Sequence, residues 1–251
     1  MQLTIVIPTY NEAQNLPRLI EAIFSTSLPA IKILIVDDAS PDGTAEIAEN
    51  MSLAYPMQIG VLRRSGKMGL GTAYIAGFQH ALRAGAEAIT QMDADFSHPP
   101  DKLVEMAAAL ESVDVVMGSR YIPGGNLDQH WPLWRKGLST FGNLYARTIL
   151  RLPIHDATGG FRMWRKDTLM RMPLERVRSN GYAFQVEMAY IAFRLGFSFK
   201  EIPFYFADRQ WGTSKMSLAI QLEAASRVWL MLSEYRDLNP SRNSRTGAMR
   251  I

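Results

Sequence analysis

The first half of the chain alternates short apolar runs with stretches that have helical spacing. Several runs, among them TIVI, ILIV and VVM, are apolar at every position, which is typical of central strands covered by helices on both faces. We predict strands at residues 3–7, 31–36, 58–62, 88–92 and 113–117, and helices at residues 15–25, 44–51, 71–84 and 101–110. This alternation predicts an α/β fold with a mostly parallel, Rossmann-like central sheet flanked by helices.

The second half begins with a loop rich in glycine and proline and continues with longer elements. We predict helices at residues 133–150, 182–195 and 216–235, a strand at 161–164, and one or two strands within 198–206. The polar and basic end of the chain predicts a disordered tail at 237–251. Since neither a repeat nor a linker interrupts the pattern, we predict a single domain over residues 1–236.

Composition excludes several classes of protein. With 251 residues, 47% of them hydrophobic and 20% charged, the chain can bury a core and is not a disordered protein. The absence of cysteine excludes a disulfide scaffold, thiolate zinc sites and iron–sulfur clusters. Any metal must be held by carboxylates, hydroxyls or the four histidines, and this donor set favours a hard divalent cation.

The chain contains no run long enough to span a membrane. Its longest stretch without a charged residue, 68–82, is interrupted by glycines, whereas a span needs about 20 apolar residues. The N-terminal sequence MQLTIVIPTYNE has neither a basic leader nor a small-residue cleavage site. We therefore expect a cytoplasmic protein.

Charge is divided unevenly along the chain. Residues 1–125 carry 8 basic and 14 acidic side chains, whereas residues 126–251 carry 19 and 10. This division suits a cation site beside an anion-binding surface, although a basic surface that aids solubility would look the same. Nucleic acid is not an expected partner, because the carboxylates at the predicted strand ends would repel a phosphate backbone.

Two carboxylates, Asp93 and Asp95, follow the predicted strand at 88–92 directly. Ligands of open α/β sheets bind at the carboxyl ends of the strands. Two carboxylates on one side of an extended segment repel each other unless a cation lies between them. The pattern therefore favours a site for Mg²⁺ or Mn²⁺ with a substrate phosphate, and a polar turn is the alternative.

Polar residues also follow the first two strands. Asp37 and Asp38 stand at a strand end, where an acidic side chain can hydrogen-bond a ribose or a base. Asp42 or Ser40 is expected to cap the following helix. The glycine-containing segment at 63–71 opens a helix, but it does not match the GxxxxGK[ST] phosphate loop.

Seven motifs occur in order over residues 3–236: IVIPTYNE, IVDDASPDGT, KMGLGTAYIAGF, QMDADFSHPP, MGSRYIPGG, DATGGFR and RQWGTSK. Together they resemble the polyprenol (dolichol) phosphate mannose synthases within the inverting glycosyltransferase family 2, which have the GT-A fold. The first, second and fourth motifs are shared widely among nucleotide-sugar transferases. GSRYxxGG, DxTGGFR and RxxGxSK narrow the resemblance to transfer onto a lipid phosphate.

The resemblance implies a role for each motif residue. The residues that would surround the nucleoside are Pro8, Tyr10, Glu12, Val36 and Asp38. Asp93, Ala94 and Asp95 would bind the nucleotide diphosphate with its metal, and Ser97 stands where several family members use Gln as a metal ligand. The cations expected to face the donor or acceptor phosphates are Arg120, Arg135, Arg209 and Lys215.

The resemblance implies transfer of mannose from GDP-mannose to a polyprenyl phosphate, with inversion and with Mg²⁺ or Mn²⁺. A glucosyltransferase that uses UDP-glucose and a non-catalytic nucleotide-sugar-binding subunit are the alternatives. Glu187 could hold a sugar hydroxyl or be an ordinary solvated helix residue. Asp156 could orient the acceptor or the sugar, or cap a turn.

Aromatic and basic residues are interleaved between residues 131 and 151. This pattern predicts either an amphipathic helix at a membrane surface or an ordinary core-facing helix, and the final helix poses the same question. Some relatives continue into membrane spans after that helix. For this chain we expect peripheral contact with the cytoplasmic face of a membrane, directly or through a membrane-protein partner.

Overall fold

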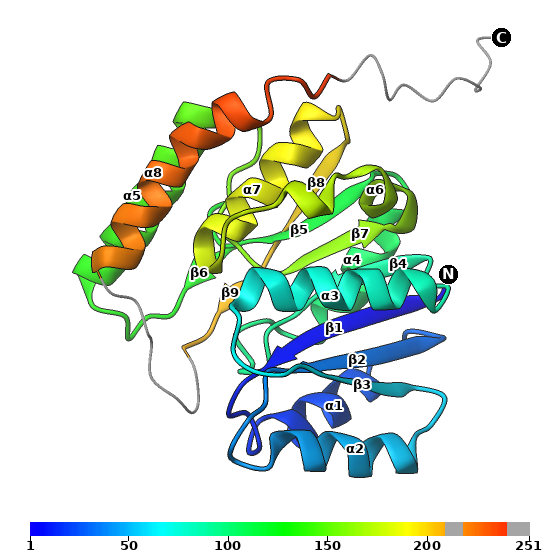
Figure 1. Cartoon of the computed structure of the whole chain (residues 1–251). Helices are drawn as coiled ribbons and strands as arrows, with labels where there is room; N and C mark the ends of the chain where they lie inside the picture. Colours follow the sequence, from blue (N-terminus) through cyan, green and yellow to red (C-terminus); the bar gives the residue numbers. More distant parts are fainter. Residues whose placement is uncertain (209–217, 240–251) are drawn as a thin grey trace, which may run out of the picture.

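The fold is built on one seven-stranded sheet, whose strands are labelled in Figure 1. The computed structural model describes residues 1–208 and 218–239, with the backbone alone for 218–224. The strands, in the order β3-β2-β1-β4-β7-β5-β8, are β1 (Leu3–Thr9), β2 (Ile31–Asp37), β3 (Ile59–Arg63), β4 (Ala88–Gln91), β5 (Val115–Ser119), β7 (Arg162–Arg165) and β8 (Phe199–Pro203). A second sheet pairs the two-residue strands β6 (Asn126–Leu127) and β9 (Tyr205–Phe206).

β7 runs antiparallel to both of its neighbours, and the other neighbouring strands of the large sheet are parallel. Arg162 is aligned with Gln91 of β4 on one side and with Met117 of β5 on the other. β7 therefore joins two halves of the sheet that are separated in the sequence. The predicted mostly parallel α/β sheet is confirmed.

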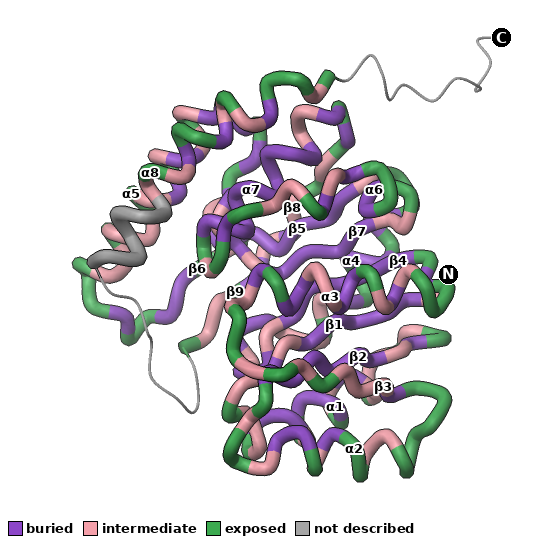
Figure 2. Tube along the Cα trace, viewed as in Figure 1, coloured by how far each residue is buried: buried purple, intermediate pink, exposed green. Residues whose placement is uncertain are grey.

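Helices cover both faces of the sheet and create two apolar cores. One face packs against α1 (Leu16–Phe24), α2 (Thr44–Ala54) and α4 (Lys102–Leu110). The other packs against α3 (Leu70–Arg83), α6 (Lys166–Arg171), α7 (Gly181–Arg194) and parts of α5 (Leu133–Leu150) and α8 (Leu218–Glu234). Figure 2 shows the buried residues concentrated in the strands between these layers.

Strand β1 explains why the apolar runs do not alternate. Ile5 and Ile7 point into the first core and Val6 into the second, and all three side chains have no exposed surface. Gly77 lets α3 approach this strand closely, because a Cβ at position 77 would lie 2.3 Å from Val6 Cγ1. A strand covered on both faces must be apolar at every position.

The predicted elements are present with small shifts at their ends. β5 begins at Val115, two residues later than predicted, because the Asp114 carboxylate accepts bonds from the backbone and hydroxyl of Ser198. Residues 198–206 form two strands, and the short helix α6 and a 3₁₀ turn at Leu174–Arg176 were not predicted. In the described part of the chain, no helix combines the length and the apolar character needed to cross a bilayer.

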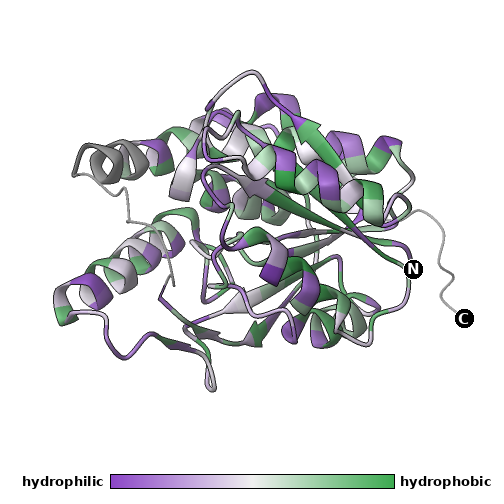
Figure 3. Ribbon diagram, turned by 90° about the horizontal axis from the view of Figure 1, so that it is seen from below, coloured by the Kyte–Doolittle hydropathy of each residue, from purple (hydrophilic) through white to green (hydrophobic). Residues whose placement is uncertain are grey.

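Helices α5 and α8 contact each other and extend beyond the sheet (Figures 1 and 3). The Tyr145 hydroxyl donates to the Ala225 carbonyl at 3.2 Å and accepts from Trp229 Nε1 at 2.9 Å. The buried side chains of α5 are Asn143, Ala146 and Leu150, and Figure 3 shows hydrophobic and hydrophilic residues interleaved along this helix. The core-facing alternative therefore holds only for its second half.

Candidate active site

The ends of β1, β2 and β4 bring polar residues to one edge of the sheet. Asp37 organises this edge, because its carboxylate accepts hydrogen bonds from Thr9 Oγ1 (2.9 Å), Ser40 N (2.9 Å) and Ser40 Oγ (2.6 Å). Asp42 accepts from the backbone N–H of Thr44 at the start of α2 (3.1 Å). The N-cap residue of α2 is Gly43, so neither Asp42 nor Ser40 is the cap that the sequence predicted; Asp42 bonds to the first helical residue and Ser40 bonds to Asp37.

Asp38 and Arg64 form a pair of nearly buried charges at this edge. Asp38 Oδ1 and Arg64 Nη1 lie 3.0 Å apart, yet neither atom has a hydrogen-bond partner among the described residues. Burial raises the pKa of Asp38, and the Arg64 guanidinium offsets part of that effect. Buried polar atoms are almost always hydrogen-bonded, so this pair has capacity to bind a polar ligand.

The other residues expected around a nucleoside lie beside this pair. Pro8 and Val36 are register neighbours on β1 and β2, and the Val36 side chain is fully buried, which leaves only its backbone for a ligand. Lys67 Nζ lies 4.3 Å above the Tyr10 ring. The Glu12 carboxylate accepts from Asn15 Nδ2 at 2.7 Å. All of the predicted residues lie at or just after the ends of β1 and β2, and their contact with a nucleoside stays a prediction.

The two DxD carboxylates are held by different partners. Asp93 Oδ1 accepts from the Tyr74 hydroxyl (2.8 Å), and the Asp93 backbone N–H donates to His98 Nδ1 (3.0 Å). Asp95 Oδ1 accepts from Ser97 N (3.1 Å) and Ser97 Oγ (2.6 Å). Phe96, between Asp95 and Ser97, has a φ of 63°. This left-handed conformation costs energy for a non-glycine residue and is common at functional sites.

The donor atoms of this turn fit a hard divalent cation. Asp93 and Asp95 supply carboxylate oxygens, and Ser97 supplies a hydroxyl. Within residues 1–208 and 218–239, no group of three or more acidic, histidine or cysteine side chains forms a closed metal cage. An open site of one or two carboxylates is the form that Mg²⁺ takes when substrate phosphates complete its coordination.

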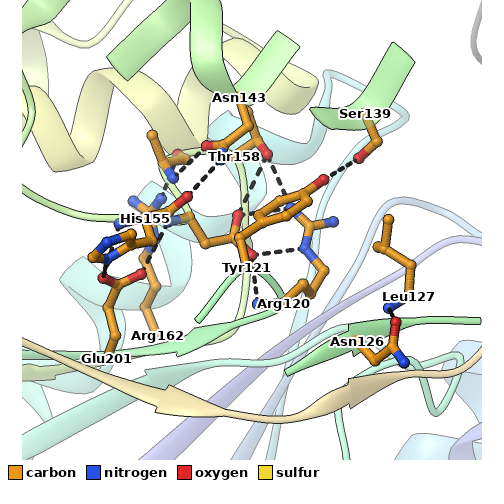
Figure 4. A network of polar contacts seen from close by, with 12 residues as sticks. Arg120, Tyr121, Asn126, Leu127, Ser139, Asn143, His155, Thr158, Arg162 and Glu201 are labelled. Atoms are coloured by element: carbon orange, nitrogen blue, oxygen red, sulfur yellow. Dashed lines mark hydrogen bonds and ion pairs between the residues drawn. The ribbon is translucent and has the colours of Figure 1, made fainter. Parts of the chain in front are cut away.

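Arg120, which Figure 4 labels, forms a buried bidentate ion pair with Asp156. Arg120 Nε and Nη2 each lie 2.7 Å from an Asp156 oxygen, and Nη2 also donates to Thr158 Oγ1 at 2.9 Å. Burial raises the pKa of Asp156, but Arg120 outweighs it, so the pKa lies below its usual value. Asp156 is therefore neither a local turn cap nor exposed to solvent, and the predicted phosphate contact of Arg120 stays a prediction.

Surrounding elements fix the turn that carries Asp156 (Figure 4). Glu201 of β8 accepts from the backbone N–H groups of His155 (2.8 Å) and Asp156 (2.9 Å). Asn143 of α5 donates to the His155 carbonyl and accepts from the Ala157 N–H (2.9 Å). The turn is thus tied to β8 and α5, which leaves the Asp156 carboxylate little freedom to move.

Of the remaining predicted cations, the structure describes Arg135 alone. The Arg135 guanidinium stacks 3.7 Å from the centre of the Trp131 ring and lies 3.3 Å from the Asp208 carboxylate. Arg209 and Lys215 lie outside the described residues. In the expected tail, Asp237 pairs with Arg176 at 2.8 Å, and residues 240–251 are not described.

Glu187 is fully buried, so the alternative of a solvated helix residue is wrong. Its carboxylate accepts from Ser179 N (2.7 Å) and Tyr235 Oη (2.6 Å), and Arg227 Nη2 lies at 3.3 Å. These bonds connect α7 to the preceding loop and to α8. Glu187 therefore has a structural role at the contact between α7 and α8.

Sequence reasoning missed three residues that shape this edge. Sequence analysis gives no role to Arg64 in the segment at 63–71, to Tyr74 in the motif KMGLGTAYIAGF or to His98 in the motif QMDADFSHPP. His98 stands three residues after the DxD motif, and that proximity was the available signal.

The chain matches a model of a known protein family. The model for Glycosyl transferase family 2 matches residues 4–172. The chain belongs to this family. The polyprenol monophosphomannose synthase of Mycolicibacterium smegmatis is 42% identical over 225 residues, which cover 89% of this chain and 84% of that protein. The undecaprenyl-phosphate mannosyltransferase of Micrococcus luteus is 41% identical over 240 residues, 95% of this chain and 98% of that protein.

These relatives confirm the resemblance that the motifs indicated. The glucosyl-3-phosphoglycerate synthase of Mycobacterium tuberculosis, solved with Mn²⁺, UDP and glucosyl-3-phosphoglycerate, has a TM-score of 0.63 at 15% identity and covers 93% of this chain and 79% of its own. A likeness at that identity concerns the fold. The expected GT-A architecture is therefore confirmed.

Proposed function

We propose that this chain transfers mannose from GDP-mannose to a polyprenyl phosphate, with inversion and with Mg²⁺ or Mn²⁺. The observation that carries the proposal is the identity of 42% and 41% to two proteins named for mannosyl transfer to a polyprenol, over 84% and 98% of their lengths. The DxD turn at the carboxyl edge of the sheet supports it, because that edge is where open α/β sheets bind nucleotides.

The donor nucleotide binds along the ends of β1 and β2 in this proposal. Asp38 Oδ1 and Arg64 Nη1 form a buried ion pair in which neither atom makes a hydrogen bond within the described structure, and Lys67 lies over the Tyr10 ring. A nucleoside offers hydroxyl and ring N–H groups that can pair with those atoms. UDP-glucose as donor would use the same edge, so the choice of base and sugar is a matter for experiment.

Asp93 and Asp95 would hold the divalent cation, with Ser97 beside them. When bound, such a cation neutralises the charge that develops on the departing nucleoside diphosphate. Asp95 contributes a carboxylate whose orientation is fixed by two bonds from Ser97. Preorganised charge of this kind lowers the barrier more than it strengthens ground-state binding.

The acceptor phosphate needs little activation. A phosphate monoester is ionised near neutral pH, with a second pKa of about 6, so its oxygen can attack the anomeric carbon without a strong general base. The bond from that carbon to the nucleoside diphosphate breaks as the new bond forms, and one displacement inverts the configuration. Arg135 lies near the protein surface with its guanidinium on Trp131, where it can face an incoming phosphate.

Helix α5 offers the surface that would meet the membrane carrying the acceptor. Its exposed apolar side chains are Leu133 (85% exposed), Trp134 (70%), Phe141 (64%) and Leu144 (56%). Arg135 and Lys136 stand beside them, and Trp229 of the adjacent α8 is 57% exposed. Aromatic and basic residues on one amphipathic helix favour peripheral contact with an anionic bilayer, which we place at the cytoplasmic face.

The test is transfer of labelled sugar into an organic phase that retains the lipid product. GDP-mannose and UDP-glucose are offered separately with a short polyprenyl phosphate, in the presence of Mg²⁺, Mn²⁺ or a chelator. We expect label from GDP-mannose that disappears with the chelator. Label from UDP-glucose alone would show that UDP-glucose is the donor and that the assignment of GDP-mannose is wrong.

A matched pair of variants separates catalysis from simple binding. Asp95→Asn should lower transfer at least about 100-fold, whereas Asp101→Asn, at an exposed residue before α4, should leave it unchanged. Binding of GDP-mannose without transfer to any polyprenyl phosphate would favour a non-catalytic nucleotide-sugar-binding subunit.

A further inference from the structure

Asp93 is held on two sides by residues that belong to neither the predicted nucleoside site nor the predicted metal ligands. Tyr74 of α3 donates its hydroxyl to Asp93 Oδ1 at 2.8 Å. His98, which follows the DxD turn, accepts the Asp93 backbone N–H on Nδ1 at 3.0 Å. One contact fixes the carboxylate and the other fixes the main chain.

Tyr74 cannot readily move its hydroxyl away from Asp93. The side chain is fully buried, and its ring lies 5.9 Å from the ring of Phe184, with only 2° between the two planes. Phe78 stacks at the same centroid distance within α3. A phenol hydroxyl has one hydrogen to donate, and the geometry directs it to Asp93 Oδ1.

His98 is placed as firmly. Its side chain is 2% exposed, and the ring stacks on Phe161 with centroids 5.0 Å apart and an interplanar angle of 10°. Because Nδ1 accepts a backbone N–H, the proton of the neutral ring is on Nε2. The ring therefore acts on Asp93 as a hydrogen-bond acceptor.

We infer that Tyr74 and His98 are positioning residues that hold Asp93 in the orientation needed to bind a divalent cation with a nucleoside diphosphate. The inference rests on the proposed function, since it assumes that Asp93 is a metal ligand. Outer contacts of this kind orient ligating carboxylates, and their loss typically weakens metal affinity by about 10- to 100-fold. Neither residue needs to touch a substrate for this role.

The experiment measures binding of Mn²⁺ in the presence of GDP, by the electron paramagnetic resonance of free Mn²⁺ and by calorimetry. Tyr74→Phe removes one hydroxyl and keeps the ring stack, and His98→Phe keeps a ring without its acceptor. We expect each to weaken Mn²⁺ binding by about 10-fold or more. His98→Asn should recover most of the affinity, because the amide oxygen can accept the Asp93 N–H in place of Nδ1.

Tyr235→Phe is the matched control. It removes another buried tyrosine hydroxyl that donates to a carboxylate, that of Glu187, and it should leave Mn²⁺ binding unchanged. Thermal unfolding of every variant separates loss of fold from loss of metal binding.

The outcomes separate this inference from the proposed function. If the wild-type chain binds Mn²⁺ with GDP and both Tyr74→Phe and His98→Phe bind it equally well, the positioning roles are wrong while the metal site stands. If His98→Asn and His98→Phe lose Mn²⁺ affinity equally, the role assigned to Nδ1 is wrong. Absence of Mn²⁺ binding by the wild-type chain overturns the metal assignment and this inference together.

Discussion

Arg120 and Asp156 face each other through two parallel hydrogen bonds of 2.7 Å, although they come from different segments of the chain. The Arg120 backbone N–H adds a third bond to the same carboxylate at 3.0 Å. The pair connects the GSRY segment at the end of β5 with the DATGG turn before β7. Two motifs distant in the sequence thus form one structural unit.

Replacing Asp156 by Asn should destabilise the protein strongly. The Arg120 guanidinium would stay buried without its counter-charge, and breaking a buried ion pair by removing one partner costs about 3–5 kcal/mol. Urea unfolding measures the change. Asp237→Asn, which removes the exposed partner of Arg176, should change the midpoint little, and equal effects of the two substitutions would contradict this expectation.

The same pair predicts how stability depends on pH. Because the folded-state pKa of Asp156 lies below its ordinary value of 3.8, the pair contributes fully above that value. Its contribution is lost as pH falls through the lower, folded-state pKa. The difference in unfolding free energy between wild type and Asp156→Asn should therefore shrink below about pH 4. A difference that grew on acidification would reverse the sign of the argument.

Asp95→Asn should lower mannosyl transfer at least about 100-fold while the unfolding midpoint stays close to that of the wild type. The amide retains an oxygen that can accept both bonds from Ser97, so the turn keeps its shape. Initial rates with saturating donor measure the effect. Full activity in this variant would exclude Asp95 as a metal ligand.

The exposed residues of α5 should determine binding to lipid vesicles. Trp134 and Phe141 lie two helical turns apart, and burying a large apolar side chain contributes about 1.5–3 kcal/mol. The double substitution Trp134→Ser and Phe141→Ser should therefore reduce co-sedimentation with anionic vesicles by at least about 10-fold. Leu53→Ser, at an 81% exposed position on α2, is the control and should not alter it.

Gly77→Ala should destabilise the protein by about 1–3 kcal/mol, because the new methyl group would overlap Val6 Cγ1. Val6→Ala removes that methyl group of β1. The double variant should be less destabilised than the sum of the two single variants, a coupling that unfolding in denaturant can measure. Strict additivity would mean that the helix moves away from the strand instead.

Local patterns predicted much of the fold because they act over a few residues. The apolar runs predicted β1 to β5, and helical spacing predicted α5 and α7. The predicted and observed ends of these elements differ by no more than about two residues. The insertion of β7 between β4 and β5 could not be predicted, since strand order depends on contacts distant in the sequence. The short helix α6 was missed because six residues carry little periodic signal.

The candidate site was predictable at the motif level and not at the level of contacts. The motifs identified Asp93 and Asp95, but only the fold shows that Tyr74 of α3 reaches Asp93. Arg120 was expected to face phosphate, and its pairing with Asp156 depends on a turn held by β8 and α5. Such relations arise from tertiary packing, which no short window of sequence encodes.

The placement of β7 also governs when the sheet can be completed during synthesis. β4 and β5 have both been made by residue 119, but the strand that joins them begins at Arg162. Until those later residues leave the ribosome, each of the two strands keeps an unpaired edge, and such edges invite aggregation. The nascent chain therefore cannot join β4 to β5 before β7 has been made, and β8 completes the sheet only after that.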